Sequence, residues 1–134
     1  MRDLTAKFGN SAGKIWKILS EKGTLHKDQL KEETRLKNED FHGGIGWLAR
    51  ENKIAKEDKE NLKLDNTNLT DKIGSDAARV WRILEIWGEV DIHSIQRLAD
   101  VQEEDVHTAL GWLAREDKIC IDEFSRFKLK ENKD

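Results

Sequence analysis

The side chains best suited to chemistry in this chain of 134 residues are basic, and they concentrate in its first half. Lysine and arginine bind the phosphate oxygens of nucleic acids without reading the base sequence. The candidate contacts lie on a short predicted helix, in the turn after it, at the end of the next helix and on a predicted hairpin: Lys27, Lys31, Arg35, Lys37, Arg50, Lys56 and Lys59. Double-stranded DNA is therefore one candidate partner. A solvated, lysine-rich surface is the alternative interpretation.

A nonapeptide that occurs twice supplies a second set of candidates. The chain reads GWLARENKI and, 65 residues later, GWLAREDKI. Tryptophan and arginine are enriched in binding hot spots, so Trp47, Trp112 and Arg115 form a candidate interaction surface. Alternatively, both tryptophans pack within their own domain, under the hairpin or against the short second helix. The glycines then permit a close backbone contact, and Arg50 pairs with a nearby carboxylate.

Apolar side chains in the second half replace charged side chains of the first half. Ile86, Trp87 and Phe124 occupy such positions, and so do Ile92 and Ile121. Apolar side chains gathered in this way are buried against something in a working protein. We expect the sister domain to cover them, with a homodimer or a foreign protein partner as the alternatives. Ile86, Trp87 and Phe124 therefore join the candidate interaction surface.

Patterns typical of enzymes do not occur in the sequence. It contains no glycine-rich phosphate loop and no nucleophile motif, and its four histidines lack a metal-ligand spacing within either half. We therefore expect a non-enzymatic protein with no cofactor, no metal and no small-molecule substrate. Cys120 is the only cysteine, which predicts the reducing cytoplasm as its location. No apolar run approaches the ~20 residues of a membrane helix, so no membrane contact is expected.

Charge is divided unevenly along the chain, whose net charge is −3. Residues 1–65 hold 14 basic and 12 acidic side chains, or +2, whereas residues 66–134 hold 10 and 15, or −5. A nucleic-acid-binding domain usually carries a basic surplus. The second half is therefore the poorer candidate for binding DNA.

The two halves are copies of one unit. Shifting the chain by 65 residues aligns Leu4–Asp65 with Leu69–Lys130 without a gap, and 22 of the 62 positions are identical. A repeat of this length indicates two small structural units in tandem. We therefore predict two domains, residues 1–65 and residues 66–134.

Each unit reads as helix, short strand, helix, turn, helix and hairpin. The first helix has the i, i+3, i+4, i+7 spacing of an amphipathic helix, carried by Ala12, Ile15, Trp16 and Leu19. We expect its N-cap at Asn10 or Ser11, and that of its copy at Ser75 or Asp76. The end of each unit alternates between apolar and polar residues around a polar turn, which predicts the hairpin.

The segments AGKIW…GIGWLARENKI and AARVW…ALGWLAREDKI resemble a small prokaryotic winged helix-turn-helix family of unassigned function. Both copies match its signature, and together they cover nearly the whole chain. The resemblance implies a mainly α fold with small β-hairpins, arranged as two tandem winged helix-turn-helix domains. The third helix is then the recognition helix and the hairpin is the wing. It also implies a link to DNA and no catalytic role.

Two functions are compatible with these features. The first is a nucleic-acid-associated regulator of transcription or chromatin, in which repeat 1 contacts the phosphate backbone. The second is a protein–protein interaction scaffold that uses the apolar surface of repeat 2 and binds no DNA. The first function is the preferred one, and the acidic first turns of both third helices, which repel phosphate, leave the second nearly as well supported. His42 and His107 are expected to be partly exposed surface histidines rather than base readers.

Overall fold

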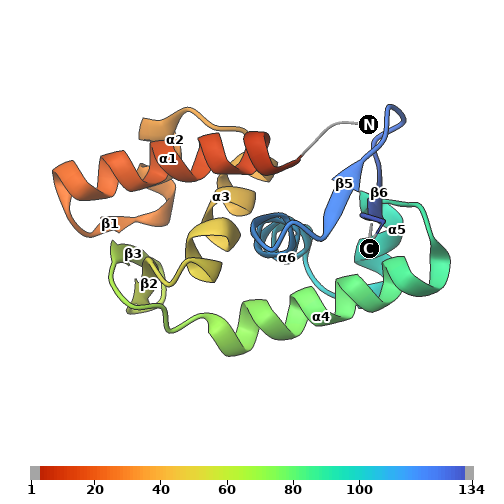
Figure 1. Cartoon of the computed structure of the whole chain (residues 1–134). Coiled ribbons are helices and arrows are strands. Elements are labelled where there is room, and N and C mark those ends of the chain that lie inside the picture. Colours follow the sequence, from red (N-terminus) through yellow and green to blue (C-terminus); the bar gives the residue numbers. More distant parts are fainter. Residues whose placement is uncertain (1–3, 132–134) are drawn as a thin grey trace.

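The computed structural model describes residues 4–131 and folds each repeat into three helices and a small antiparallel sheet (Figure 1). Repeat 1 consists of α1 (Leu4–Lys22), β1 (Leu25–His26), α2 (Lys27–Thr34), α3 (Asn38–Arg50), β2 (Ile54–Glu57) and β3 (Asn61–Leu64). Repeat 2 consists of α4 (Thr70–Trp87), β4 (Val90–Asp91), α5 (Ile92–Ala99), α6 (Glu103–Arg115), β5 (Ile119–Ile121) and β6 (Arg126–Leu129). The predicted order of elements is confirmed in both repeats.

The first helix of each repeat begins well before its predicted N-cap. α1 begins at Leu4 and α4 begins at Thr70, upstream of all four predicted caps. The helix extends because Leu4 and Phe8, four residues apart, continue its buried face and are 1% and 2% exposed. Ser11 lies inside the helix, where its hydroxyl donates to the carbonyl oxygen of Lys7 over 3.1 Å. Ser11, although serine is a common N-cap residue, therefore lies in the interior of α1.

Each hairpin adds the short strand of its own repeat to form a three-stranded sheet, with the orders β1-β3-β2 and β4-β6-β5. In repeat 1, Leu25 lies opposite Leu62, and Ile54 lies opposite Leu64. The equivalent register recurs in repeat 2. The strands place Leu62 in the core at 2% exposure, as the alternating sequence predicted.

Residues with positive φ end the first two helices of each repeat. Gly23 and Gly88 follow α1 and α4 with φ values of 77° and 85°, a region that glycine enters without steric cost. Arg35 and Asp100 end α2 and α5 with φ values of 58° and 56°. These turns bring the third helix of each repeat across its first helix.

Each repeat contributes to the core of the other. The core that contains most of repeat 2 also includes Leu4 and Phe8 from the start of α1. The core of repeat 1 includes Ile73 from the start of α4. In Figure 1, α1 and α4 lie on opposite sides of the α3–α6 pair. The two repeats therefore form one packed unit, in which the starts of α1 and α4 are exchanged.

Candidate functional site

The third helices, α3 and α6, cross in direct backbone contact at two glycines. A Cβ atom added to Gly46 would overlap the carbonyl oxygen of Thr108, and one added to Gly111 would overlap the carbonyl oxygen of Gly43. The close approach of the two backbones therefore requires glycine at both positions. The two contacts are equivalent under the 65-residue offset. The repeats thus meet through a reciprocal interface like that of a twofold dimer.

The tryptophan and arginine of each nonapeptide complete this interface. The guanidinium of Arg50 lies 5.7 Å from the ring centre of Trp112, and that of Arg115 lies 5.6 Å from the ring centre of Trp47. Both tryptophans are half-buried and pack against both cores. The expectation that they lie under the hairpin or against the second helix of their own domain is wrong. The glycine crossing brings each third helix within reach of the other, and the tryptophans fill that junction.

Two ion pairs join the same helices. Arg50 Nε donates to a carboxylate oxygen of Glu116 over 3.1 Å, and Arg115 Nε donates to Glu51 over 3.0 Å. Each arginine side chain is 45% exposed, so each pair contributes about 0.2 to 1 kcal/mol. Arg50 has the carboxylate partner predicted for it, and that partner comes from the other repeat. Arg50, a candidate nucleic-acid contact, and Arg115, a candidate for partner binding, are both engaged within the chain.

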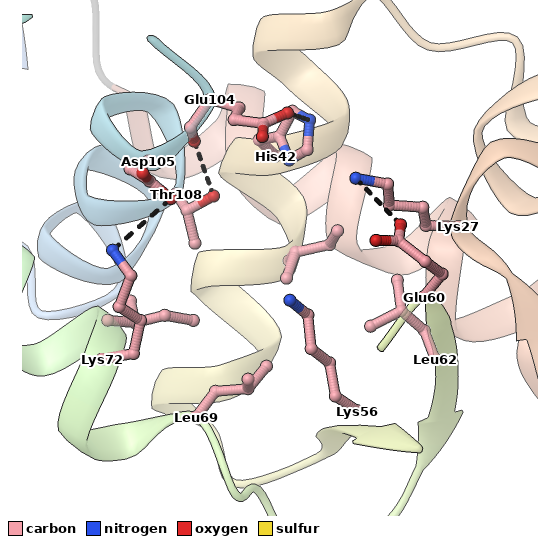
Figure 2. A pocket seen from close by; sticks show the side chains of 12 residues that line it. Lys27, His42, Lys56, Glu60, Leu62, Leu69, Lys72, Glu104, Asp105 and Thr108 are labelled. Carbon is pink, nitrogen blue, oxygen red and sulfur yellow. Dashed lines mark hydrogen bonds and ion pairs between the residues drawn. The ribbon is translucent and has the colours of Figure 1, made fainter. Parts of the chain in front are cut away.

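A pocket with a volume of about 120 Å³ opens between the repeats beside α3 (Figure 2). It is bounded by α3, the β2–β3 hairpin, the start of α4 and the first turns of α6. Its apolar wall consists of Ile45, Leu62, Leu69 and Ile73, and its polar rim consists of Lys27, His42, Lys56, Glu60, Lys72, Glu104, Asp105 and Thr108. The pocket therefore combines an apolar interior with a rim that holds charges of both signs.

Ion pairs neutralise two of the rim lysines. Lys27 Nζ lies 3.2 Å from Glu60, and this hydrogen bond raises the pKa of Lys27 and lowers the pKa of Glu60. Lys72 Nζ lies 3.6 Å from Asp105 and also pairs with Asp76. Burial lowers the pKa of Lys72, but its hydrogen bonds and charge interactions with Asp76 and Asp105 outweigh that effect and raise it. Both lysines are therefore protonated and paired at neutral pH.

His42 lies where the pocket rim meets α6. Its Nε2 atom is 3.5 Å from a carboxylate oxygen of Glu104, and its ring packs edge-on against Phe41 at 5.3 Å. Burial lowers the pKa of His42 to about 4, although Glu104 acts in the opposite direction. The equivalent His107 is only 5% exposed, with Nε2 3.4 Å from Glu103. The expectation of partly exposed surface histidines is wrong for His107 because the repeats face each other.

The structure divides the seven basic candidates among three places. Lys27 and Lys56 line the pocket, and Arg50 belongs to the interface between α3 and α6. The other four lie in α2, at its C-cap, directly before α3 and in the β2–β3 turn; they are, in that order, Lys31, Arg35, Lys37 and Lys59. Lys31 is half-buried and the other three are exposed. The seven side chains therefore do not act as one free basic surface.

Apolar side chains are exposed at the end of repeat 2 that faces away from repeat 1. Ile86, Trp87 and Phe124 are 66%, 63% and 69% exposed. Trp87 and Phe124 line one shallow groove together with Leu98, and we call these three residues the apolar patch. The expectation that the sister domain covers the apolar replacements is wrong for these three residues, because the last turn of α4 and the β5–β6 turn lie beyond the interface (Figure 1). It holds for Ile121, which is 7% exposed in the core that also contains Leu4 and Phe8.

Hydrogen bonds hold the β5–β6 turn so that Phe124 points outward. An Asp122 carboxylate oxygen accepts the backbone N–H of Phe124 over 2.8 Å and that of Arg126 over 3.0 Å. These bonds, the backbone bond to Arg126 above all, lower the pKa of Asp122. The Arg126 guanidinium also lies 5.3 Å from the ring centre of Phe124. Phe124 is therefore exposed on an ordered turn.

Residues 1–64 and residues 68–130 each match the family described as Winged helix-turn-helix domain (DUF2582). The chain belongs to this family. It consists of tandem winged helix-turn-helix domains, mainly helical with small antiparallel sheets, as the sequence predicted. No curated protein and no solved structure matches the chain.

The recognition helices of these winged helix-turn-helix domains are covered. In this fold the third helix supplies the residues that enter the DNA major groove. Along α3 the exposed residues are Asn38 and Arg50, one at each end, and along α6 they are Glu103, Glu104 and Arg115. The middle turns of both helices pack within their own winged helix and against the other. Neither helix presents a free face while the two domains are paired.

The sequence left the interdomain partners unidentified. Glu51 and Glu116 were visible as part of the nonapeptide, directly after the arginines that they bind in the other repeat. The carbonyl oxygen of Thr108 has no signal in a side-chain pattern. Phe8 was aligned with Ile73, but its position in the core of the other winged helix was not predicted. The near-identity of the two nonapeptides was the sequence signal that could have pointed to a reciprocal interface between the repeats.

Between residues 4 and 131, no cluster of three or more histidine, cysteine or carboxylate side chains is arranged to hold a metal ion. Over the same range, none of the helices is both long enough and apolar enough to cross a membrane.

Proposed function

We propose that this chain is a non-enzymatic tandem winged-helix module that binds another protein through the apolar patch of repeat 2. The observation that carries this proposal is the exposure of Trp87 and Phe124, at 63% and 69%. Large aromatic side chains grouped on a surface are typical of protein-binding hot spots. Both side chains line one groove with Leu98, so a single partner segment can contact all three.

The order of the hairpin turn supports binding at this patch. Asp122 accepts hydrogen bonds from two backbone N–H groups of the turn and an ion pair from Arg126. A binding surface that is already ordered loses less conformational entropy when a partner docks. Phe124 therefore needs little rearrangement to serve as an anchor.

The charges around the groove indicate the chemistry of the partner. Arg126 pairs with Glu89 over 3.0 Å, which neutralises one side of the groove. Arg97 also lines the groove; Asp91 in the same groove acts on it electrostatically, but within the described chain no salt bridge holds the guanidinium. A carboxylate on the partner would complete it with a charge-assisted hydrogen bond. We therefore expect an apolar peptide segment that carries a carboxylate near its anchoring side chains.

Site-specific crosslinking tests this function. A photoreactive phenylalanine analogue is placed at position 124 in the native host, and a matched analogue is placed at Trp16, an aromatic residue of repeat 1 that is 47% exposed. We expect the analogue at position 124 to crosslink to one protein, and we expect the Trp87→Ser substitution to abolish this crosslink. The same partner, once purified, should bind the chain in calorimetry. Crosslinks at both positions alike, or only to another copy of the chain, would contradict the proposal.

Nucleic-acid binding by repeat 1 is the second candidate function, supported by the exposed Arg35, Lys37 and Lys59. Such side chains can bind phosphate without the recognition helix. Random duplex DNA titrated at about 50 mM salt tests this candidate, because phosphate binding is strongest at low salt. We expect amide shifts over residues 27–37 and the β2–β3 turn if it holds. Absence of shifts there at high protein concentration excludes it.

A further inference from the structure

The pocket between the repeats has an equivalent location in the other half of the molecule, and there it is filled. Phe8 takes the place of Ile73, and a Cβ atom on the neighbouring Gly43 would overlap the Phe8 ring. Ile121 takes the place of Lys56 and is buried in the core of repeat 2. The same framework can therefore close this space with apolar side chains, and it does so on one side only.

On the open side, smaller and charged residues keep the space hollow. Ile73 is shorter than a phenylalanine, and Thr108 stands where the other half has Gly43. Lys27 and Lys56 stand where the other half has isoleucines. Lys56 and Glu104 lie at the open rim of the pocket, where they stay solvated until a ligand covers them. Because covering a charged group is costly unless the group gains a partner, this rim favours a ligand that carries charges of its own.

Two rim charges of opposite sign, Lys56 and Glu104, form no close salt bridge to a permanently charged group in the described part of the chain; Glu60 and Lys27 act on them only at longer range. Figure 2 shows the Lys56 side chain reaching into the pocket from β2, with Glu104 on the α6 side of the opening. Within residues 4–131, Lys56 Nζ forms no ion pair. Among the described residues, the salt-bridge partner of the Glu104 carboxylate is the ring of His42, which is neutral at neutral pH because burial lowers its pKa. The pocket thus offers one cation and one anion beside an apolar wall.

We propose that this pocket binds a free α-amino acid with an apolar side chain. Its carboxylate pairs with Lys56, its ammonium group pairs with Glu104, and its side chain packs against Ile45, Leu69 and Ile73. A ligand of one sign would leave either Lys56 or Glu104 unpaired, whereas a zwitterion completes both. This inference is independent of the proposed protein-binding function, because the pocket and the apolar patch share no residue.

The size of the pocket sets the side chain that fits. An apolar cavity of about 150 Å³ holds a benzene molecule. The present volume of about 120 Å³ is smaller, so it suits the three or four side-chain carbons of valine or leucine better than an aromatic ring. We therefore expect leucine and valine to bind more tightly than phenylalanine.

Three matched ligands separate the contributions of the two charges. Leucine, 4-methylpentanoate and 3-methylbutylamine share one branched skeleton. Leucine carries both charges, 4-methylpentanoate carries only the carboxylate, and 3-methylbutylamine carries only the ammonium group. In calorimetry and amide shift titrations, we expect leucine to bind with a Kd of about 1 mM or tighter, and each analogue about tenfold or more weakly. The shifts should centre on Leu69, Ile73 and Thr108. Equal binding of an analogue, or no saturable shift with leucine at about 20 mM, would overturn the proposal.

Two variants test whether binding occurs in this pocket. Lys56→Met removes the ammonium group and should weaken leucine binding about tenfold or more, whereas Lys59→Met, on the exposed turn of the same hairpin, should leave it unchanged. The double variant Ile73→Phe/Thr108→Gly copies the phenylalanine that fills the other half and the glycine that makes room for its ring, and it should abolish binding. The amide spectrum shows whether each variant is folded. If the double variant does not fold, the result for Lys56→Met alone decides the test. Equal leucine binding by Lys56→Met and Lys59→Met would disprove the assignment.

Discussion

The two repeats share their fold and their mutual interface but differ in two places on their surfaces. Repeat 1 has a charged pocket where repeat 2 is filled by Phe8, Ile121 and their neighbours. Repeat 2 has an apolar groove around Trp87, where repeat 1 has Lys22 paired with Glu33. The residues of the nonapeptide, which join the repeats, are nearly identical in the two copies. Similarity between the copies is therefore concentrated where each copy contacts the other.

This difference shows that the two parts of each copy are under separate constraints. The reciprocal contacts Arg50–Glu116 and Arg115–Glu51 use the same side chains in both copies. The groove lies away from the reciprocal contacts, and the side chains that differ at the pocket take no part in the glycine crossing, which involves backbone carbonyl oxygens. These side chains can therefore change in one copy alone. We infer that the function of the protein lies in the features that the copies do not share.

The exchange of first-helix residues should give the largest effect on stability. Phe8→Ala removes a ring that is 2% exposed in the core of repeat 2, and we expect a loss of about 3 to 5 kcal/mol in the free energy of unfolding. Ile73→Ala borders the pocket, and we expect a loss near the lower limit for isoleucine, about 2 kcal/mol. Urea denaturation of both variants measures the difference. Equal losses would show that the two halves are packed equally.

The glycine crossing should respond equally in both copies. Gly46→Ala and Gly111→Ala each force a Cβ atom against a carbonyl oxygen of the other repeat, and we expect each to cost about 2 to 3 kcal/mol. Gly13→Ala is the matched control, because a Cβ atom there meets nothing within 4 Å. The control should be more stable than the native chain by roughly 0.5 to 1 kcal/mol. A loss in one copy only would argue against a reciprocal interface.

Acid should destabilise the protein partly through His42. Its pKa is about 4 in the folded chain and 6.5 when unperturbed, so between these values the unfolded chain binds a proton that the folded chain does not. The free energy of unfolding should therefore fall as the pH falls from 6.5 to 4, by about 2 to 3 kcal/mol from this residue. His42→Gln should lack this part of the pH dependence in thermal unfolding. An unchanged pH profile would show that the ring is freely solvated.

The reciprocal ion pairs should give the smallest effects, and equal ones. Double-mutant cycles of Arg50 with Glu116 and of Arg115 with Glu51 should each give a coupling of about 0.5 kcal/mol, because both arginines are partly exposed. Both couplings should weaken at about 1 M salt, where charges are screened over a few ångströms. A coupling well above this range in one pair would reveal an asymmetry in the interface that the geometry does not suggest.

The repeats, the helices and the wings were predictable because periodicity directly reports which face of an element is apolar. What covers that face was not predictable. Phe8 has the spacing of a buried residue, but spacing does not say that the core of the other repeat receives it. Trp87 and Phe124 were expected to be covered, and both are exposed. The pocket depends on side chains from separated segments, such as Lys56 and Glu104, whose proximity only the folded chain defines.

The exchanged helix starts have a consequence for how the protein can change over generations. A symmetric homodimer carries every substitution twice, once in each half of its interface, so its two halves cannot specialise. Here Leu4 and Phe8 are encoded separately from their counterparts Leu69 and Ile73, although they occupy equivalent positions. The covalent link also keeps the halves together at any dilution. A single substitution, such as isoleucine for phenylalanine, can therefore open a cavity on one side while the other side continues to hold the molecule together.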